Sequence, residues 1–68
     1  MKVNLNGKLI ETEENTLVHV LREYASITDE SRGVAVAVDG SVIPRSRWGQ
    51  TELDEGAMVE LVLAVQGG

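Results

Sequence analysis

The stretch MVELVLAVQGG, residues 58–68, joins an apolar strand pattern to two glycines at the end of the chain. Its side chains alternate between two faces, as they do along a β-strand, and one face is much more apolar than the other. The more apolar face would carry Val59, Leu61, Leu63 and Val65, and the opposite face Met58, Glu60, Val62 and Ala64. Glycine makes up about 7% of residues, so chance places a terminal Gly-Gly on only about one chain in two hundred. The pair therefore calls for an explanation.

The opening segment predicts a β-hairpin. In MKVNLNGKLIE the apolar Val3 and Leu5 alternate with polar residues as far as Asn6-Gly7. Asn and Gly both tolerate the positive φ angles of a type I′ turn, which joins two antiparallel strands. We therefore expect a second strand near residues 8–12.

An amphipathic helix is predicted near residues 17–25. Apolar residues recur there at the i, i+3, i+4, i+7 spacing of one helical face, and the opposite face is mostly polar. The apolar face is formed by Leu17, Val20, Leu21 and Tyr24, and the opposite face by Val18, His19, Arg22 and Glu23. A side-chain oxygen of Asn15 or Thr16 can cap the first turn, and we favour Thr16.

The sequence VAVAVDGSVIP predicts a second hairpin. An apolar strand at residues 34–38 is followed by an Asp-Gly turn at 39–40 and a return strand at 42–43. Pro44 then interrupts the return strand, because proline has no N–H to donate to a neighbouring strand.

The connection to the last strand, residues 44–57, is expected to be mostly irregular, with a turn at residues 53–56. Trp48 lies in this segment, and its ring is expected to cover one end of the small core. Trp48 and Tyr24 are most simply explained as packing residues at the edge of the core.

The predicted order of elements is β, β, α, β, β, β. One short helix and four or five strands of mixed direction bury their apolar faces only if the helix lies across one side of the sheet. We therefore predict an α+β protein with the β-grasp fold of ubiquitin. In this topology the last strand is central and runs parallel to the first. Residues 1–64 would form the β-grasp domain and residues 65–68 a flexible C-terminal tail.

Composition narrows the range of functions. A chain of 68 residues forms one domain and buries only about 60% of its unfolded surface, which leaves little room for an elaborate catalytic cleft. Without cysteine it has no disulfides, thiolate metal sites or thiol nucleophile. The net charge of −5 disfavours nucleic acids and anionic membranes as partners. No signal-like or membrane-spanning stretch is evident, so we expect a cytoplasmic location.

His19 and Glu23 stand four residues apart on the predicted helix and could suggest a metal-binding pair. Two such residues without a third ligand are far more often a surface contact, so no metal site is predicted. No nucleophile, pair of acids or ligand set converges elsewhere in the sequence, and an enzyme is the least favoured class.

Two segments carry a family resemblance. VAVAVDGSVIPRSRW, residues 34–48, and LDEGAMVELVLAVQGG, residues 53–68, are similar to the thiamine-pathway sulfur carrier ThiS. The most specific parts are Ile43-Pro44-Arg45, Trp48 and the terminal Val65-Gln66-Gly67-Gly68. Two turn positions depart from the usual pattern: Asp39 stands where asparagine is common, and Ala57 stands where an acidic residue is frequent.

The resemblance implies a chemical role for Gly68. Its carboxylate would be adenylated by a ThiF-like enzyme that uses ATP, and a cysteine desulfurase would supply sulfur to form a thiocarboxylate. Thiazole synthase (ThiG-like) would then accept the sulfur. The carrier would be monomeric when free and would bind no cofactor itself.

The tail would deliver Gly68 to its partners. Glycines without Cβ atoms can pass through a narrow channel, and residues 65–68 (Val65, Gln66, Gly67 and Gly68) extended at about 3.3 Å each reach roughly 13 Å. A docking surface beside the tail would have to supply affinity, and Arg45 and Arg47 are candidates for it.

Other functions remain open on sequence grounds. A small subunit of molybdopterin synthase is also a β-grasp protein that ends in Gly-Gly. A ubiquitin-like modifier would instead join Gly68 to a lysine amine. A plain interaction domain with an inert tail would be unaffected by loss of Gly68.

Overall fold

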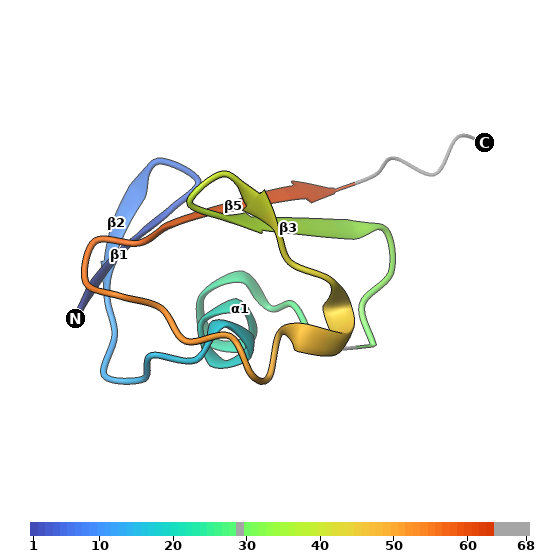
Figure 1. Ribbon diagram of the computed structural model, residues 1–68, viewed down its shortest axis with the longest axis horizontal. Helices are drawn as coiled ribbons and strands as arrows, with labels where there is room; N and C mark the ends of the chain where they lie inside the picture. The colour runs from blue at the N-terminus through green and yellow to red at the C-terminus, as the bar shows by residue number, and fades with distance from the viewer. Residues whose placement is uncertain (29, 64–68) are drawn as a thin grey trace.

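The computed structural model describes residues 1–28 and 30–63 and has one α-helix and five strands, arranged as in Figure 1. The strands are β1 (Lys2–Leu5), β2 (Lys8–Glu11), β3 (Val34–Val38), β4 (Ser41–Val42) and β5 (Met58–Leu63). The helix α1 spans Leu17–Ala25, and a short 3₁₀ helix, η1, spans Arg45–Arg47.

The strands form one mixed sheet in the order β2-β1-β5-β3-β4. The last strand is central: β5 runs parallel to β1 and antiparallel to β3. Helix α1 lies across one face of this sheet and leaves the other face open (Figure 1). The predicted α+β class, the β-grasp fold and the central parallel position of the last strand are confirmed.

Both predicted Asp/Asn-Gly turns have the backbone that the sequence demands. The φ angles are 52° and 85° at Asn6 and Gly7, and 49° and 87° at Asp39 and Gly40. Positive φ at both central residues defines the type I′ turn, whose twist matches that of the flanking strands. Each hairpin is therefore determined locally by its turn residues.

The helix begins after Thr16, as predicted, but the predicted side-chain cap is wrong: Thr16 makes no capping hydrogen bond through its side chain. Backbone carbonyls of the 48–51 segment take that role. The Leu17 N–H donates to the Thr51 carbonyl at 2.9 Å, and the Val18 N–H to the Trp48 carbonyl at 3.2 Å. The helix N–H groups are thus satisfied by a segment about thirty residues away, which the local sequence does not reveal.

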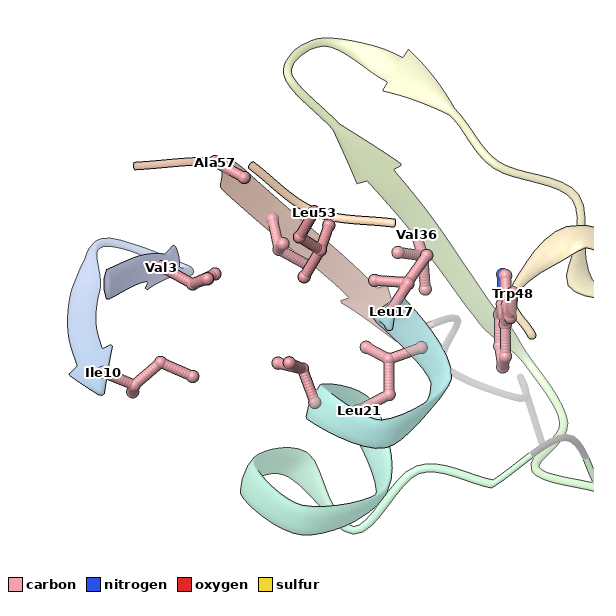
Figure 2. Close-up of a cluster of buried hydrophobic side chains, with 10 residues drawn as sticks. Val3, Ile10, Leu17, Leu21, Val36, Trp48, Leu53 and Ala57 are labelled. Atoms are coloured by element: carbon pink, nitrogen blue, oxygen red, sulfur yellow. The ribbon is translucent and has the colours of Figure 1, made fainter. Parts of the chain in front are cut away.

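The core lies between α1 and the sheet, and Figure 2 shows its side chains converging from both. Its buried hydrophobic residues are Val3, Ile10, Leu17, Val20, Leu21, Val36, Trp48, Leu53, Ala57 and Val59. Trp48 stands at one end of this cluster, as predicted, and Val3 and Ile10 stand at the other (Figure 2). The indole Nε1–H of Trp48 donates to the Ile43 carbonyl at 3.0 Å, so the one polar group of this buried side chain is satisfied.

Two helix residues differ from the simple amphipathic pattern. Val18, expected on the polar face, is partly buried against the core because the 48–51 segment covers the start of the helix. Tyr24, expected at the edge of the core, is 40% exposed, and its hydroxyl donates to the Glu11 carbonyl at 2.7 Å. It therefore ties the end of the helix to β2.

Strand β5 alternates as predicted only where the helix lies beneath it. Val59 is 0% exposed, whereas Leu63, on the same side of the strand, is 63% exposed. The difference arises because β5 runs past α1, which lies beneath only the earlier part of the strand (Figure 1). The predicted continuation of the strand to Val65, and the boundary between domain and tail, lie outside the described residues.

Candidate functional site

The strand that leads to Gly68 is held from both sides by turn residues. On the β1 side, the Asn6 N–H donates to the Val59 carbonyl at 2.9 Å. The Asn6 side chain continues this pairing by accepting from the Leu61 N–H through Oδ1 at 2.7 Å and donating to the Leu61 carbonyl through Nδ2 at 3.4 Å. Asn6 therefore extends a parallel ladder whose backbone register covers Asn4↔Met58 and Leu5↔Val59.

On the β3 side, Asp39 pairs in the same way with Met58, the first residue of β5. Its N–H donates to the Met58 carbonyl at 2.8 Å, and its Oδ1 accepts from the Met58 N–H at 2.9 Å. The register with β3 then runs from Val38↔Val59 to Val34↔Leu63. Strand β5 is thus bonded on the β3 side along its whole described length and on the β1 side as far as Leu61.

The predicted tail residues, Val65, Gln66, Gly67 and Gly68, lie outside the described residues. Their roles stay predictions. What the structure does describe is their point of attachment, the last residue of a central strand bonded on both edges.

The two predicted docking arginines lie on η1, and their environments differ. The Arg45 guanidinium carbon stands 5.1 Å from the centroid of the Trp48 ring, in cation–π contact, and its side chain is half-buried. Arg47 is exposed and forms no ion pair with any other described residue. Arg45 therefore has a packing role whatever else it does, and of the two Arg47 has the more accessible charge.

A shallow groove of about 600 Å³ lies beside Arg45 and Trp48. Its lining consists of Val18, Arg45, Ser46, Trp48 and Gly49. Because Trp48 is buried and Arg45 lies over its ring, the groove offers no open aromatic face for stacking. We interpret the groove as the boundary where η1 packs against the start of α1.

The pair formed by His19 and Glu23 is a surface contact, as predicted. His19 Nε2 lies 2.7 Å from Glu23 Oε2, and both side chains are substantially exposed. Glu11, Glu13 and Glu14 border the same shallow concavity. Within residues 1–28 and 30–63 no three metal-ligating side chains come together, and the arrangement suits a solvated acidic surface.

The face of the sheet away from α1 carries a feature that the sequence reasoning missed. Asn4 pairs with both Leu9 and Met58, Ala37 pairs with both Glu60 and Val42, and Ala35 pairs with Val62, so these residues share one face. Lys2 and Glu11 pair with each other on the same side as Asn4 and Leu9. We call this side the open face, and it comprises Lys2, Asn4, Leu9, Glu11, Ala35, Ala37, Val42, Met58, Glu60 and Val62.

The open face is unusually apolar for a solvated surface. The exposed fractions are 62% for Leu9, 72% for Val42, 52% for Met58 and 64% for Val62. The solvent side of an antiparallel sheet normally alternates to polar residues, so this departure is informative. The signal is present in the sequence, because the less apolar side of MVELVLA still holds methionine and valine.

These features define a class of protein: a small ubiquitin-like β-grasp domain with a central last strand and a sequence that ends in Gly-Gly. In the described part of the chain, no helix is long and apolar enough to cross a membrane. Residues 3–68 match the model of the ThiS family, a match that includes both final glycines, and the chain belongs to that family.

A solved structure agrees with this assignment. The chain is similar to the crystal structure of a thiamine biosynthesis protein (ThiS) from Geobacter metallireducens, with 27% sequence identity and a TM-score of 0.73. The similarity covers 100% of this chain and 99% of that one. No curated protein matches the sequence.

Proposed function

We propose that the protein is a sulfur carrier in thiamine biosynthesis and that it carries sulfur as a thiocarboxylate on Gly68. Membership of the ThiS family and similarity to a thiamine biosynthesis protein support a carrier role in that pathway. The structural observation that carries the proposal is the central position of β5. The strand held on both edges is the one that leads to Gly68.

The chemistry follows from the reactivity of a carboxylate. A terminal carboxylate has a pKa near 3.3 to 3.7 and is ionised at neutral pH, so it resists attack by nucleophiles. One carboxylate oxygen would attack the α-phosphate of ATP and displace pyrophosphate, which gives an acyl-adenylate. A persulfide formed by the cysteine desulfurase would then attack the acyl carbon and displace AMP, which takes the activated oxygen with it. A second thiol of the partner enzymes would attack the S–S bond of the acyl disulfide, form a disulfide with the cysteine that carried the persulfide and release the thiocarboxylate.

The partners proposed for these steps are a ThiF-like adenylating enzyme, a cysteine desulfurase as sulfur source and a ThiG-like thiazole synthase as acceptor. The carrier acts as co-substrate of these enzymes and performs no catalysis itself. ATP is bound by the adenylating enzyme, so the domain needs no cofactor of its own.

The body of the protein has a physical part in this scheme. Ordering each tail residue in a partner's channel costs on the order of 1 to 2 kcal/mol, and glycines contribute few contacts to offset it. Affinity must therefore come from the folded domain. A rigid central strand also aims the tail, because β5 cannot swing relative to the docked surface.

The decisive measurement is the intact mass of the protein purified from cells in which the pathway is active. We expect a species heavier by one oxygen-to-sulfur exchange, and its loss when Gly68 is deleted. A ladder of isopeptide-linked products would instead identify a modifier. Rescue of a molybdenum-cofactor auxotroph, but not of a thiazole auxotroph, would identify a molybdopterin-synthase subunit.

A further inference from the structure

The turn between β1 and β2 combines a reactive dipeptide with hydrogen bonds that restrain it. Asn6 and Gly7 are both exposed, and nothing lies within 4 Å of the position that a Cβ on Gly7 would take. Water and hydroxide therefore reach the peptide bond between them. The Asn6 side chain binds Leu61 through both of its polar atoms, and the Gly7 N–H donates to Asn4 Oδ1 at 2.8 Å. The turn is thus open to solvent but held from two sides.

We infer that Asn6 is a modification site, where the side-chain amide is lost by spontaneous deamidation at a rate set by the hydrogen bonds to Leu61 and Asn4. In this reaction the Gly7 nitrogen gives its proton to a solvent base and attacks the Asn6 side-chain carbonyl carbon, Cγ. The new C–N bond closes a five-membered succinimide, and the amide nitrogen takes a proton from water and leaves as ammonia. Water then opens either ring carbonyl, which gives aspartate or isoaspartate at position 6.

The dipeptide favours ring closure on chemical grounds. Glycine has no Cβ to shield its nitrogen or to clash with the closing ring. The chain's other asparagines are Asn4 and Asn15. The residues that follow them are leucine and threonine, whose side chains crowd the attacking nitrogen. Asn6 is therefore the asparagine at which the reaction is expected first.

The backbone of the turn opposes the reaction. A flat succinimide needs the Asn6 Cβ and the Gly7 nitrogen on the same side of the Cα–C bond. At Asn6 φ is 52°, in the left-handed region, where ψ is about +30 to +60°. For an L residue this ψ places Cβ nearly opposite the next nitrogen. Ring closure thus requires the peptide plane between the two central residues of the type I′ turn to rotate by nearly half a turn.

The side-chain contacts add to this restraint. Because both amide atoms of Asn6 are bound to Leu61, Cγ is held toward β5, and both bonds must break before the side chain can turn back to Gly7. The bond from the Gly7 N–H to Asn4 Oδ1 stabilises the proton that must leave before the nitrogen attacks. The reaction therefore requires local opening of the turn.

The products change how β5 is held. Aspartate at position 6 keeps an acceptor for the Leu61 N–H but offers no hydrogen to the Leu61 carbonyl, so a carboxylate oxygen faces that carbonyl. Isoaspartate adds a methylene to the main chain, which no longer fits a two-residue turn between β1 and β2. Either product weakens the contact between β1 and β5. The inference goes beyond the sulfur-carrier role and does not depend on it.

The test follows the conversion of Asn6 in the full-length protein at neutral pH, in buffer and in denaturing urea. Cleavage after Lys2 and Lys8 isolates residues 3–8, and fragmentation in the mass spectrometer distinguishes Asn6 from Asn4. Labelling by an isoaspartyl methyltransferase reports the isoaspartate. We expect conversion at Asn6 to be at least about tenfold slower in buffer than in urea, because the fold maintains the restraining bonds. Asn15 is the internal control and should stay unconverted over the same period.

Three variants separate local control from global unfolding. Asn4→Ala leaves the dipeptide intact but removes the acceptor of the Gly7 N–H, and it should raise the rate in buffer about two- to tenfold. Asn4→Asp keeps an acceptor and should not exceed the wild-type rate. Trp48→Phe alters the opposite end of the core from β1 and should leave the rate unchanged, since it touches neither residue of the dipeptide (Figure 2).

Each remaining outcome contradicts a separate part of the inference. Equal rates in buffer and urea would show that the fold does not restrain the turn, and no conversion at Asn6 in urea would refute the site itself. Acceleration by Trp48→Phe as large as that by Asn4→Ala would show that global unfolding sets the rate. Circular dichroism before incubation confirms that each variant is folded. The converted protein, separated by its added negative charge, should unfold at a lower temperature, and an unchanged midpoint would refute the effect on β5.

Discussion

Asn6 binds Leu61 through both polar atoms of its side chain, with the Leu61 N–H donating to Oδ1 at 2.7 Å and Nδ2 donating to the Leu61 carbonyl at 3.4 Å. The amide acts as an additional peptide group at the end of β1. It lengthens the contact between the first strand and the strand that precedes the tail. The residue chosen for a type I′ turn therefore has a second, long-range role.

We expect Asn6→Ala to lower the free energy of unfolding by about 1 to 3 kcal/mol, measured by urea denaturation. It removes both side-chain bonds and places alanine at a positive φ of 52°. Asn6→Gly is the matched variant, because it loses the same bonds but tolerates the backbone angle, and it should cost less. Equal and negligible losses for both variants would show that the Leu61 contact does not stabilise the fold.

The N-terminus of α1 allows a direct comparison of two threonines. Thr16→Ala should cost less than about 0.5 kcal/mol, below the ~1 kcal/mol typical of an N-cap residue, because its side chain makes no capping bond. Thr12→Ala should cost about 1 to 2 kcal/mol, since its buried hydroxyl bonds to the Glu14 N–H and carbonyl at 3.1 Å each. The reverse order in urea unfolding would contradict the observed capping by the 48–51 segment.

Trp48 should be the most sensitive position of the core. A domain of 68 residues has about 3 to 10 kcal/mol of stability, and loss of a large buried aromatic side chain costs about 3 to 5 kcal/mol. Trp48→Ala is therefore expected to be largely unfolded by circular dichroism. Trp48→Phe should remain folded but lose about 1 to 3 kcal/mol, in part because the Ile43 carbonyl loses its donor.

Arg45→Ala removes the cation that lies over the Trp48 ring. It should cost about 0.5 to 2 kcal/mol, the range of cation–π contacts from exposed to desolvated sites. Arg47→Ala is the control on the same short helix and should be neutral within about 0.5 kcal/mol. A loss for Arg47→Ala as large as that for Arg45→Ala would argue against the specific contact with Trp48.

Deletion of Gly68, or the change Gly67→Val, should abolish thiolation without changing the unfolding midpoint. The proposed chemistry needs the terminal acyl group and two final residues without Cβ atoms, whereas the core is formed by other residues. Intact-mass measurement reports thiolation and thermal unfolding reports the fold. Full thiolation of Gly67→Val would contradict a narrow channel in the partner.

Removal of the Glu60 charge from the centre of the open face should promote self-association. With Glu60→Val, two copies can meet through apolar residues without bringing their Glu60 carboxylates together. We expect the wild type to sediment as a monomer and the variant to form dimers as concentration rises into the submillimolar range. A strictly monomeric variant would show that Glu60 is not what keeps this face from pairing with itself.

Much of this protein could be predicted from local sequence. Asn6-Gly7 and Asp39-Gly40 specify type I′ turns because their backbone angles are a property of those residues themselves. The spacing of Leu17, Val20 and Leu21 specifies a helical face for the same kind of reason. Once the order of elements was known, few arrangements could bury their apolar sides, and the β-grasp fold followed.

Other features were decided only by tertiary structure, because they depend on residues far apart in the chain. The Thr16 side chain does not cap the helix because carbonyls at Trp48 and Thr51 already accept the first N–H groups. The open face exists only through strand register, which brings Leu9, Val42 and Val62 to one side of the sheet. Local periodicity records which way a side chain points, but only the pairing of distant strands determines which side chains become neighbours.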